Sequence, residues 1–160
     1  MDQDHEYPDS LCLSRVHSPD PVLETLRECY QAAERLLEDF AVPQLAFFAT
    51  RHLAELCLKA LDENPQRGHD LDKLLRRLEE QGHDLLSRGE PQRTITAFIR
   101  DLHAVDPGGD EGRYATTTKK VPSLAEVCCG RQELLVKYVN QLYIYTVTHA
   151  NFGPEGTTTA

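Results

Sequence analysis

The sequence contains no tryptophan and a single methionine, and it has no long uninterrupted hydrophobic run. No apolar stretch approaches the roughly 18 residues that a membrane-spanning helix requires, so we expect no membrane partner. The first twenty residues have neither the basic start nor the continuous apolar core of a secretory signal. Without a predicted membrane-spanning helix or secretory signal, we expect a cytoplasmic protein.

Cysteine occurs five times, an odd number, and no pair has the spacing of a zinc site. Cys29, Cys57 and Cys128 fall on the apolar faces of predicted helices, where a thiol behaves as a small hydrophobic group. Cys128 and Cys129 are adjacent, whereas structural zinc sites commonly separate two cysteines by two or more residues. We therefore expect neither a metal site nor a cofactor.

Positive charge is also scarce, because 17 basic residues face 26 acidic ones and the formal net charge is −9. Non-specific binding to duplex DNA depends on cations that displace counterions from phosphates, so we expect no duplex DNA partner. Arg113, Lys119 and Lys120 form the only basic cluster outside the predicted helices. This cluster leaves a local contact with nucleic acid open.

Hydrophobic residues recur with the helical period of 3.6 in five segments, and no segment alternates as a strand does. The predicted helices span residues 21–40, 43–61, 70–82, 91–105 and 123–149, with a break near Gly130 in the last. The second helix is apolar around most of its circumference, which places it in the middle of a bundle. We predict an all-α, up-and-down bundle of about five helices over residues 20–150, between a flexible arm (1–19) and a disordered tail (151–160).

Three charged residues interrupt the apolar second helix. Arg51, Glu55 and Lys59 are four residues apart, so Glu55 can pair with either neighbour. One interpretation is a ladder on the solvent-facing strip, where each pair contributes only about 0.3–0.5 kcal/mol. The other is a latch, in which Arg113 from the later loop meets Glu55. Burial of the charges would weaken the first interpretation, because removing charges from water is costly.

A series of motifs resembles a known family. The stretch "RHLAELCLKAL" from Arg51 to Leu61 is followed by "GHDL" from Gly68 and by Leu74-Leu75, and Arg113-Tyr114 comes later. This series resembles the HEPN family, whose members carry an apolar "ELxLKAL" helix, a short turn and "GHDLxxLL" opening the next helix. The resemblance covers about residues 21 to 150. It implies an all-α bundle that usually forms a homodimer.

The resemblance also implies a range of activities. Many HEPN proteins are metal-independent RNases of toxin–antitoxin, phage-defence or RNA-processing systems, and others are binding modules or partners of a nucleotidyltransferase. Active members resemble each other in an Arg-x4–6-His motif near the start of the last long helix, which suits acid/base chemistry beside a fixed cation. Here His149 is the only histidine after Arg113, and the matching pairs, Arg76 and Arg77 with His83, lie elsewhere.

We therefore expect an atypical HEPN module that binds RNA or a protein partner in a defence or toxin–antitoxin-like system. The first alternative is a metal-independent endoribonuclease with a displaced site, in which His69 and Arg113 are catalytic or His103 replaces His69. The second is a helical scaffold without a nucleic-acid role. His69 also has a structural interpretation, in which it forms part of the turn and cap before the third helix.

The loop after the fourth helix carries the candidate RNA-binding residues. An arginine and a tyrosine beside lysines can bind a phosphate and stack a base, as proteins commonly do with single-stranded RNA. The candidate partner is single-stranded RNA or tRNA, and the residues are Arg113, Tyr114, Lys119 and Lys120.

The last predicted helix carries several tyrosines. Tyr138, Leu142 and Tyr145 form either a packed stripe whose hydroxyls reach the surface or part of a dimer or partner interface.

Overall fold

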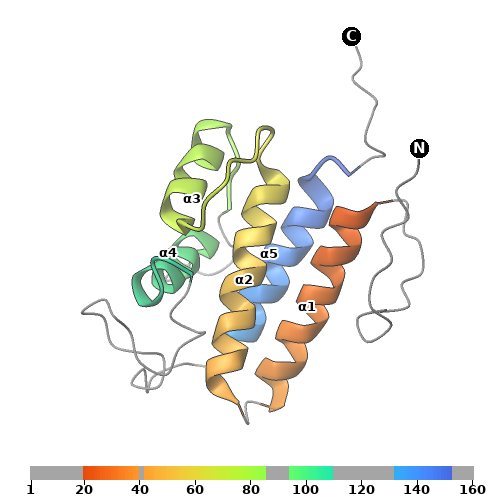
Figure 1. The fold of residues 1–160 in the computed structure, drawn as a ribbon, viewed down its shortest axis with the longest axis vertical. Coiled ribbons are helices and arrows are strands. Elements are labelled where there is room, and N and C mark those ends of the chain that lie inside the picture. The colour runs from red at the N-terminus through yellow and green to blue at the C-terminus, as the bar shows by residue number, and fades with distance from the viewer. Residues whose placement is uncertain (1–19, 40–41, 86–93, 110–131, 153–160) are drawn as a thin grey trace, which may run out of the picture.

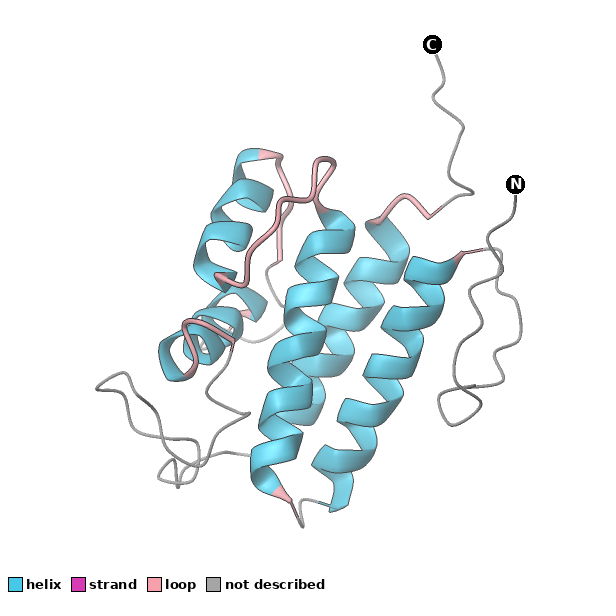
Figure 2. Ribbon diagram, in the orientation of Figure 1, coloured by secondary structure: helices cyan, strands magenta, loops and turns pink. Residues whose placement is uncertain are grey.

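The structure is a computed structural model that describes residues 20–39, 42–85, 94–109 and 132–152. In these ranges it contains only helices and the loops that join them (Figure 2). The helices are α1 (Pro21–Asp39), α2 (Pro43–Leu61), α3 (Leu71–Glu80), α4 (Ile95–Val105) and α5 (Gln132–His149). The predicted all-α fold class is confirmed. None of the described helices is long and apolar enough to cross a membrane.

Polar side chains set the starts of several helices. The carboxylate of Asp20 accepts the amide of Leu23 at the start of α1, and that of Asp70 accepts the amide of Lys73 at the start of α3. The fourth helix begins at Ile95, later than predicted, because the Thr94 hydroxyl accepts the Ala97 amide and caps it there. The predicted start of the fifth helix, residues 123–131, lies outside the described residues.

Three long helices, α1, α2 and α5, lie side by side, and α3 and α4 pack on one flank of α2 (Figure 1). Within the described chain α2 contacts each of the other four helices. The prediction that the second helix lies in the middle of a bundle is therefore confirmed. This central position also determines the surroundings of its charged residues.

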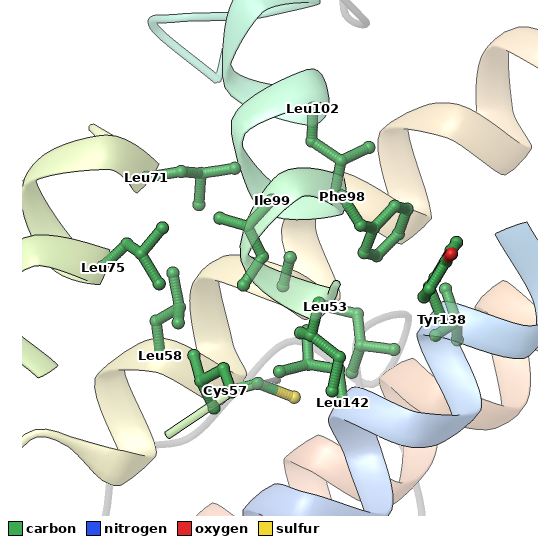
Figure 3. Packing of buried hydrophobic residues seen from close by; sticks show 14 of the residues in the cluster. Leu53, Cys57, Leu58, Leu71, Leu75, Phe98, Ile99, Leu102, Tyr138 and Leu142 are labelled. Carbon is green, nitrogen blue, oxygen red and sulfur yellow. The ribbon is translucent and has the colours of Figure 1, made fainter. Parts of the chain in front are cut away.

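The hydrophobic core joins side chains from α2, α3, α4 and α5 (Figure 3). Phe98 of α4 stacks on Tyr138 of α5 with 5.4 Å between the ring centroids. Leu53 of α2, Leu75 of α3 and Leu142 of α5 are fully buried in the same core. Burial of such side chains supplies most of the favourable free energy of folding. Because the interior is closely packed, the charged residues of α2 lie beside a rigid, apolar core.

Candidate functional site

Arg51 lies in the middle of α2 with only 1% of its surface exposed. Its guanidinium donates hydrogen bonds in three directions. Nη1 reaches the Glu55 carboxylate at 2.9 Å, Nε reaches the backbone carbonyl of Asp106 at 3.0 Å, and Nη2 reaches the backbone carbonyl of His69. Nε also lies 3.6 Å from the buried Asp106 carboxylate. One side chain thus joins α2 to the turn before α3 and to the segment after α4, and we call these four residues the Arg51 latch.

The segment after α4 approaches the Arg51 latch closely at Gly109. This residue has a φ of +74°, and a Cβ atom there would lie 2.9 Å from Nη1 of Arg51 and 3.0 Å from Cζ. The backbone is therefore packed against the face of the guanidinium. Glycine fits because it has no Cβ and tolerates positive φ.

Glu55 is the meeting point of three cationic or polar groups. Its Oε2 accepts Nη1 of Arg51, while its Oε1 lies 2.7 Å from Nζ of Lys59 and 2.9 Å from Nδ1 of His69. Burial by itself would raise the pKa of the Glu55 carboxyl, but the hydrogen bonds from Lys59 and His69 outweigh it and the pKa is lowered. Glu55 is therefore an ionised carboxylate at neutral pH.

The interpretation of Arg51, Glu55 and Lys59 as a solvent-facing ladder is wrong for the first two residues. Arg51 and Glu55 are 1% and 4% exposed, and only the Lys59 side chain, at 24%, reaches solvent. The physical reason is that α2 has neighbours on several sides, so its charged strip faces two loops instead of water. A latch exists, but its arginine is Arg51. The predicted contact between Arg113 and Glu55 lies outside the described residues.

Two roles were predicted for His69, one in the turn and cap before α3 and one in catalysis, and its surroundings have features of both. Its backbone carbonyl is held by Arg51 and it directly precedes Asp70, the cap of α3, which is the structural role. Its ring is nevertheless 61% exposed and bound at Nδ1 to Glu55. The other candidate histidine, His103, places Nδ1 3.7 Å from the Asp70 carboxylate. Both histidines therefore lie near the start of α3.

The four candidate RNA-binding residues fall outside the described part of the chain. They stay predictions from the sequence, and they are Arg113, Tyr114, Lys119 and Lys120.

The tyrosine stripe of α5 belongs largely to the core. Tyr138 and Leu142 are each 1% exposed, and Tyr145 is partly buried against the core. Tyr138 and Leu142 are therefore not accessible to a partner, and the prediction of an interface centred on them is wrong. Core packing is the role that the structure gives them, because α5 packs against α1, α2 and α4.

Arg77 and His83, which match the Arg-x4–6-His spacing at the end of the third predicted helix, each bind another side chain. Arg77 pairs with Asp62, with 2.9 Å between Nε and Oδ2, and His83 lies 3.3 Å from the Tyr145 hydroxyl. Asp62 is 5% exposed and also accepts a hydrogen bond from Gln81 at 2.8 Å. The hydrogen bond from Arg77 is the largest cause that lowers the pKa of the Asp62 carboxyl, from 3.8 to about 2.

Asp62→Asn is expected to lower the free energy of unfolding by about 1–2 kcal/mol at pH 7. A lowered carboxyl pKa in the folded state stabilises the protein above the unfolded pKa, and this stability is lost as the pH falls through the folded value. The difference between wild type and variant should therefore shrink between about pH 5 and pH 2. Urea denaturation at several pH values measures it. A difference that stays constant over this range would show that Asp62 acts through packing alone.

No group of three or more histidine, cysteine or acidic residues among the described residues is arranged to hold a metal ion. Cys57 is buried, which raises the pKa of its thiol to about 12, so it is neutral and hydrophobic in character. Cys128 and Cys129 lie outside the described residues.

Comparison with family models, with curated proteins and with solved structures found no match to this chain. The resemblance to the HEPN family therefore rests on the sequence motifs alone.

Proposed function

We propose that the chain is an atypical HEPN module that binds single-stranded RNA in a defence or toxin–antitoxin-like system. The observation that supports this function best is the Arg51 latch. It holds the segment that leads to the basic and aromatic cluster against the turn that carries the exposed His69 ring. A binding surface needs such fixed supports, because ordering a free loop costs conformational entropy on binding.

Chain length limits how far the cluster can lie from the latch. The backbone of Gly109 packs on Arg51, and Arg113 follows it by four residues. Four extended residues span at most about 14 Å, which is the upper limit on the distance between the two residues along the chain. In a chain with a net charge of −9, a local basic cluster is the place where an RNA strand would be attracted.

The same proposal includes a homodimer, a nucleotidyltransferase-like or other protein partner, and a cytoplasmic location. They follow from the HEPN resemblance and from the composition, and each is open to direct test. Sedimentation of the purified chain determines whether it is a dimer.

Fluorescence anisotropy with labelled single-stranded RNA and tRNA in EDTA tests the proposal. We expect binding that weakens with salt and that weakens about tenfold or more in an Arg113→Ala, Tyr114→Ala variant, because a phosphate contact and a stacked base are lost. Arg27→Ala is the matched control, since Arg27 is an exposed arginine on α1. RNA affinity that is absent in wild type, or equal in both variants, would contradict the proposal and favour the helical scaffold.

A metal-independent endoribonuclease that uses His69 and Arg113 is the second candidate. The observation in its favour is the hydrogen bond between the Glu55 carboxylate and the exposed ring of His69. A carboxylate in this position orients an imidazole for proton transfer. Cleavage of the same RNAs by wild type, but not by an Arg113→Ala, His69→Ala variant, would establish it.

A further inference from the structure

Hydrophobic side chains at the start of α2 are exposed. Val42 and Leu45 are 43% and 52% exposed, and Phe48 is only partly buried. Residues three apart on a helix are neighbours on its surface, so these three side chains form one apolar strip, which we call the Leu45 face. Single exposed apolar residues are common, whereas a contiguous group of them commonly marks an interaction site. The Leu45 face is therefore a candidate docking surface.

Both ends of one long segment, residues 110–131, lie beside this part of α2. At one end, the backbone of Gly109 packs on the guanidinium of Arg51, which is about 12 Å along the axis from the start of α2. At the other end, Nε2 of Gln132 donates hydrogen bonds of 2.6 and 2.9 Å to two backbone carbonyls in the last turn of α1. The last turn of α1 is close to the start of α2, because a short connection joins the two helices. The segment is therefore held at both ends near the Leu45 face.

The two ends of the whole chain continue from the opposite end of the bundle. Figure 1 shows that α1 runs antiparallel to α2 and that α5 runs parallel to it. The start of α1 and the end of α5 therefore lie beside the end of α2, and α1 alone is 19 residues, or about 28 Å, long. Residues 1–19 and 153–160 thus begin much further from the Leu45 face than residues 110–131 do.

The sequence of residues 110–131 includes apolar side chains that suit this face. Leu124, Val127 and Cys128 recur at the spacing of one helix face just before α5, in a part of the chain outside the described residues. Gly130 follows them, and glycine permits the change of direction that a straight continuation of α5 would not make. An extended segment of 22 residues spans about 70 Å, so chain length does not limit its reach.

We propose that the Leu45 face is the docking site of residues 123–129 of the same chain. Leu124 and Val127 pack against Leu45, and removal of these apolar surfaces from water drives the contact. The occupant is thus a segment whose two ends the described structure already places beside the face. The docking does not require RNA or a second copy of the chain.

This docking also affects the loop that carries the predicted RNA-binding residues. Gly109 holds the loop against Arg51 on one side, and residues 123–129 hold it against the Leu45 face on the other. A loop that is fixed at both ends loses less conformational entropy when it binds RNA. This consequence rests on the proposed function, whereas the docking itself does not.

NMR of the full chain with labelled leucine, valine and isoleucine methyl groups tests the docking. We expect nuclear Overhauser cross-peaks between the methyl groups of Leu45 and those of Leu124 or Val127. Ile144 is the matched control, because it is 55% exposed on α5 and should show no cross-peak to either residue. Absence of the Leu45 cross-peaks would overturn the proposal. Cross-peaks that arise between labelled and unlabelled chains in a mixed sample would also overturn it, because a second copy would then cover the face.

Hydrogen exchange of the backbone amides of residues 124–129 measures how firmly the segment docks. Leu45→Gln should speed their exchange about five- to tenfold, because it removes apolar surface from the contact and raises the population of the undocked state. Ile144→Gln changes a similarly exposed residue outside the face and should leave these rates unchanged. Equal exchange in wild type and Leu45→Gln would overturn the proposal. Leu45 is half exposed, so this variant should keep the fold, and the cross-peaks of the wild type test the docking independently of any variant.

The anisotropy measurement with labelled RNA separates the docking from the proposed function. If both hold, Leu45→Gln should weaken RNA binding about fivefold and Ile144→Gln should not change it. Cross-peaks in a wild type that binds no RNA would overturn the RNA-binding function and leave the docking standing. RNA binding without the cross-peaks would overturn the docking and leave the binding function standing.

Discussion

Arg51→Met is expected to lower the free energy of unfolding by about 3–5 kcal/mol at pH 7, the largest effect of any single substitution in the latch. Methionine can fill much of the same space, so the loss comes from electrostatics and hydrogen bonding. The Glu55 and Asp106 carboxylates would lose a buried cation, and the carbonyls of His69 and Asp106 would lose a donor. A buried charge or carbonyl that loses one of its partners is destabilised by much more than an exposed group would be.

The matched control for this prediction is Arg27→Met. Arg27 also pairs with a glutamate on its own helix, with Nη2 2.5 Å from Oε1 of Glu24, but its side chain is 56% exposed. An exposed pair of this kind contributes at most about 1 kcal/mol. Urea denaturation at pH 7 compares the two variants. Similar losses in both would mean that the Arg51 latch holds the loops no better than a surface ion pair does.

The sequence predicted the helices and the centre of the bundle because both depend on local patterns. Hydrophobic period, proline at the first position of α2 and the aspartates before α1 and α3 are readable without knowledge of the neighbours. The apolar circumference of α2 correctly indicated contacts on many sides. The start of α4 was misplaced because Thr94 is a weaker signal than Pro91, although its hydroxyl caps the helix.

The surroundings of Arg51 were not predictable in the same way. Spacing by four residues identified Glu55 as a partner, but α2 is apolar on most faces, so periodicity could not indicate which strip faces water. Arg51 also donates to the backbone carbonyls of His69 and Asp106, which every residue possesses and no motif marks. The run "DPGG" from Asp106 indicates a turn, but the sequence does not show what the turn packs against.

The tyrosines of α5 show the same limit. Their spacing predicts a stripe, and a stripe of this kind suits a core and an interface equally well. The contact of Tyr138 with Phe98 of α4 places Tyr138 in the core. This contact depends on how α4 and α5 pack, which the spacing of the tyrosines does not indicate.

Gly109→Ala is the second substitution with a large expected effect, a loss of about 2–4 kcal/mol in the free energy of unfolding. Part of this loss is the strain of a positive φ, about 1–2 kcal/mol for a residue with a Cβ. The rest arises because the new methyl group would lie 2.9 Å from Nη1 of Arg51. The end of an arginine usually moves away at little cost. Here the guanidinium is buried and bound to three groups, so moving it breaks the Arg51 latch.

Gly82→Ala separates the two contributions. Gly82 has a similar φ of +82°, but a Cβ atom there would have no neighbour within 4 Å. Its variant should therefore lose only the backbone part, about 1–2 kcal/mol. In an Arg51→Met background the excess loss of Gly109→Ala over Gly82→Ala should disappear, because the displaced guanidinium is no longer present. If the excess loss persists in this background, contacts other than the Arg51 latch hold the segment after α4. Arg51 would then contribute to the stability of α2 only.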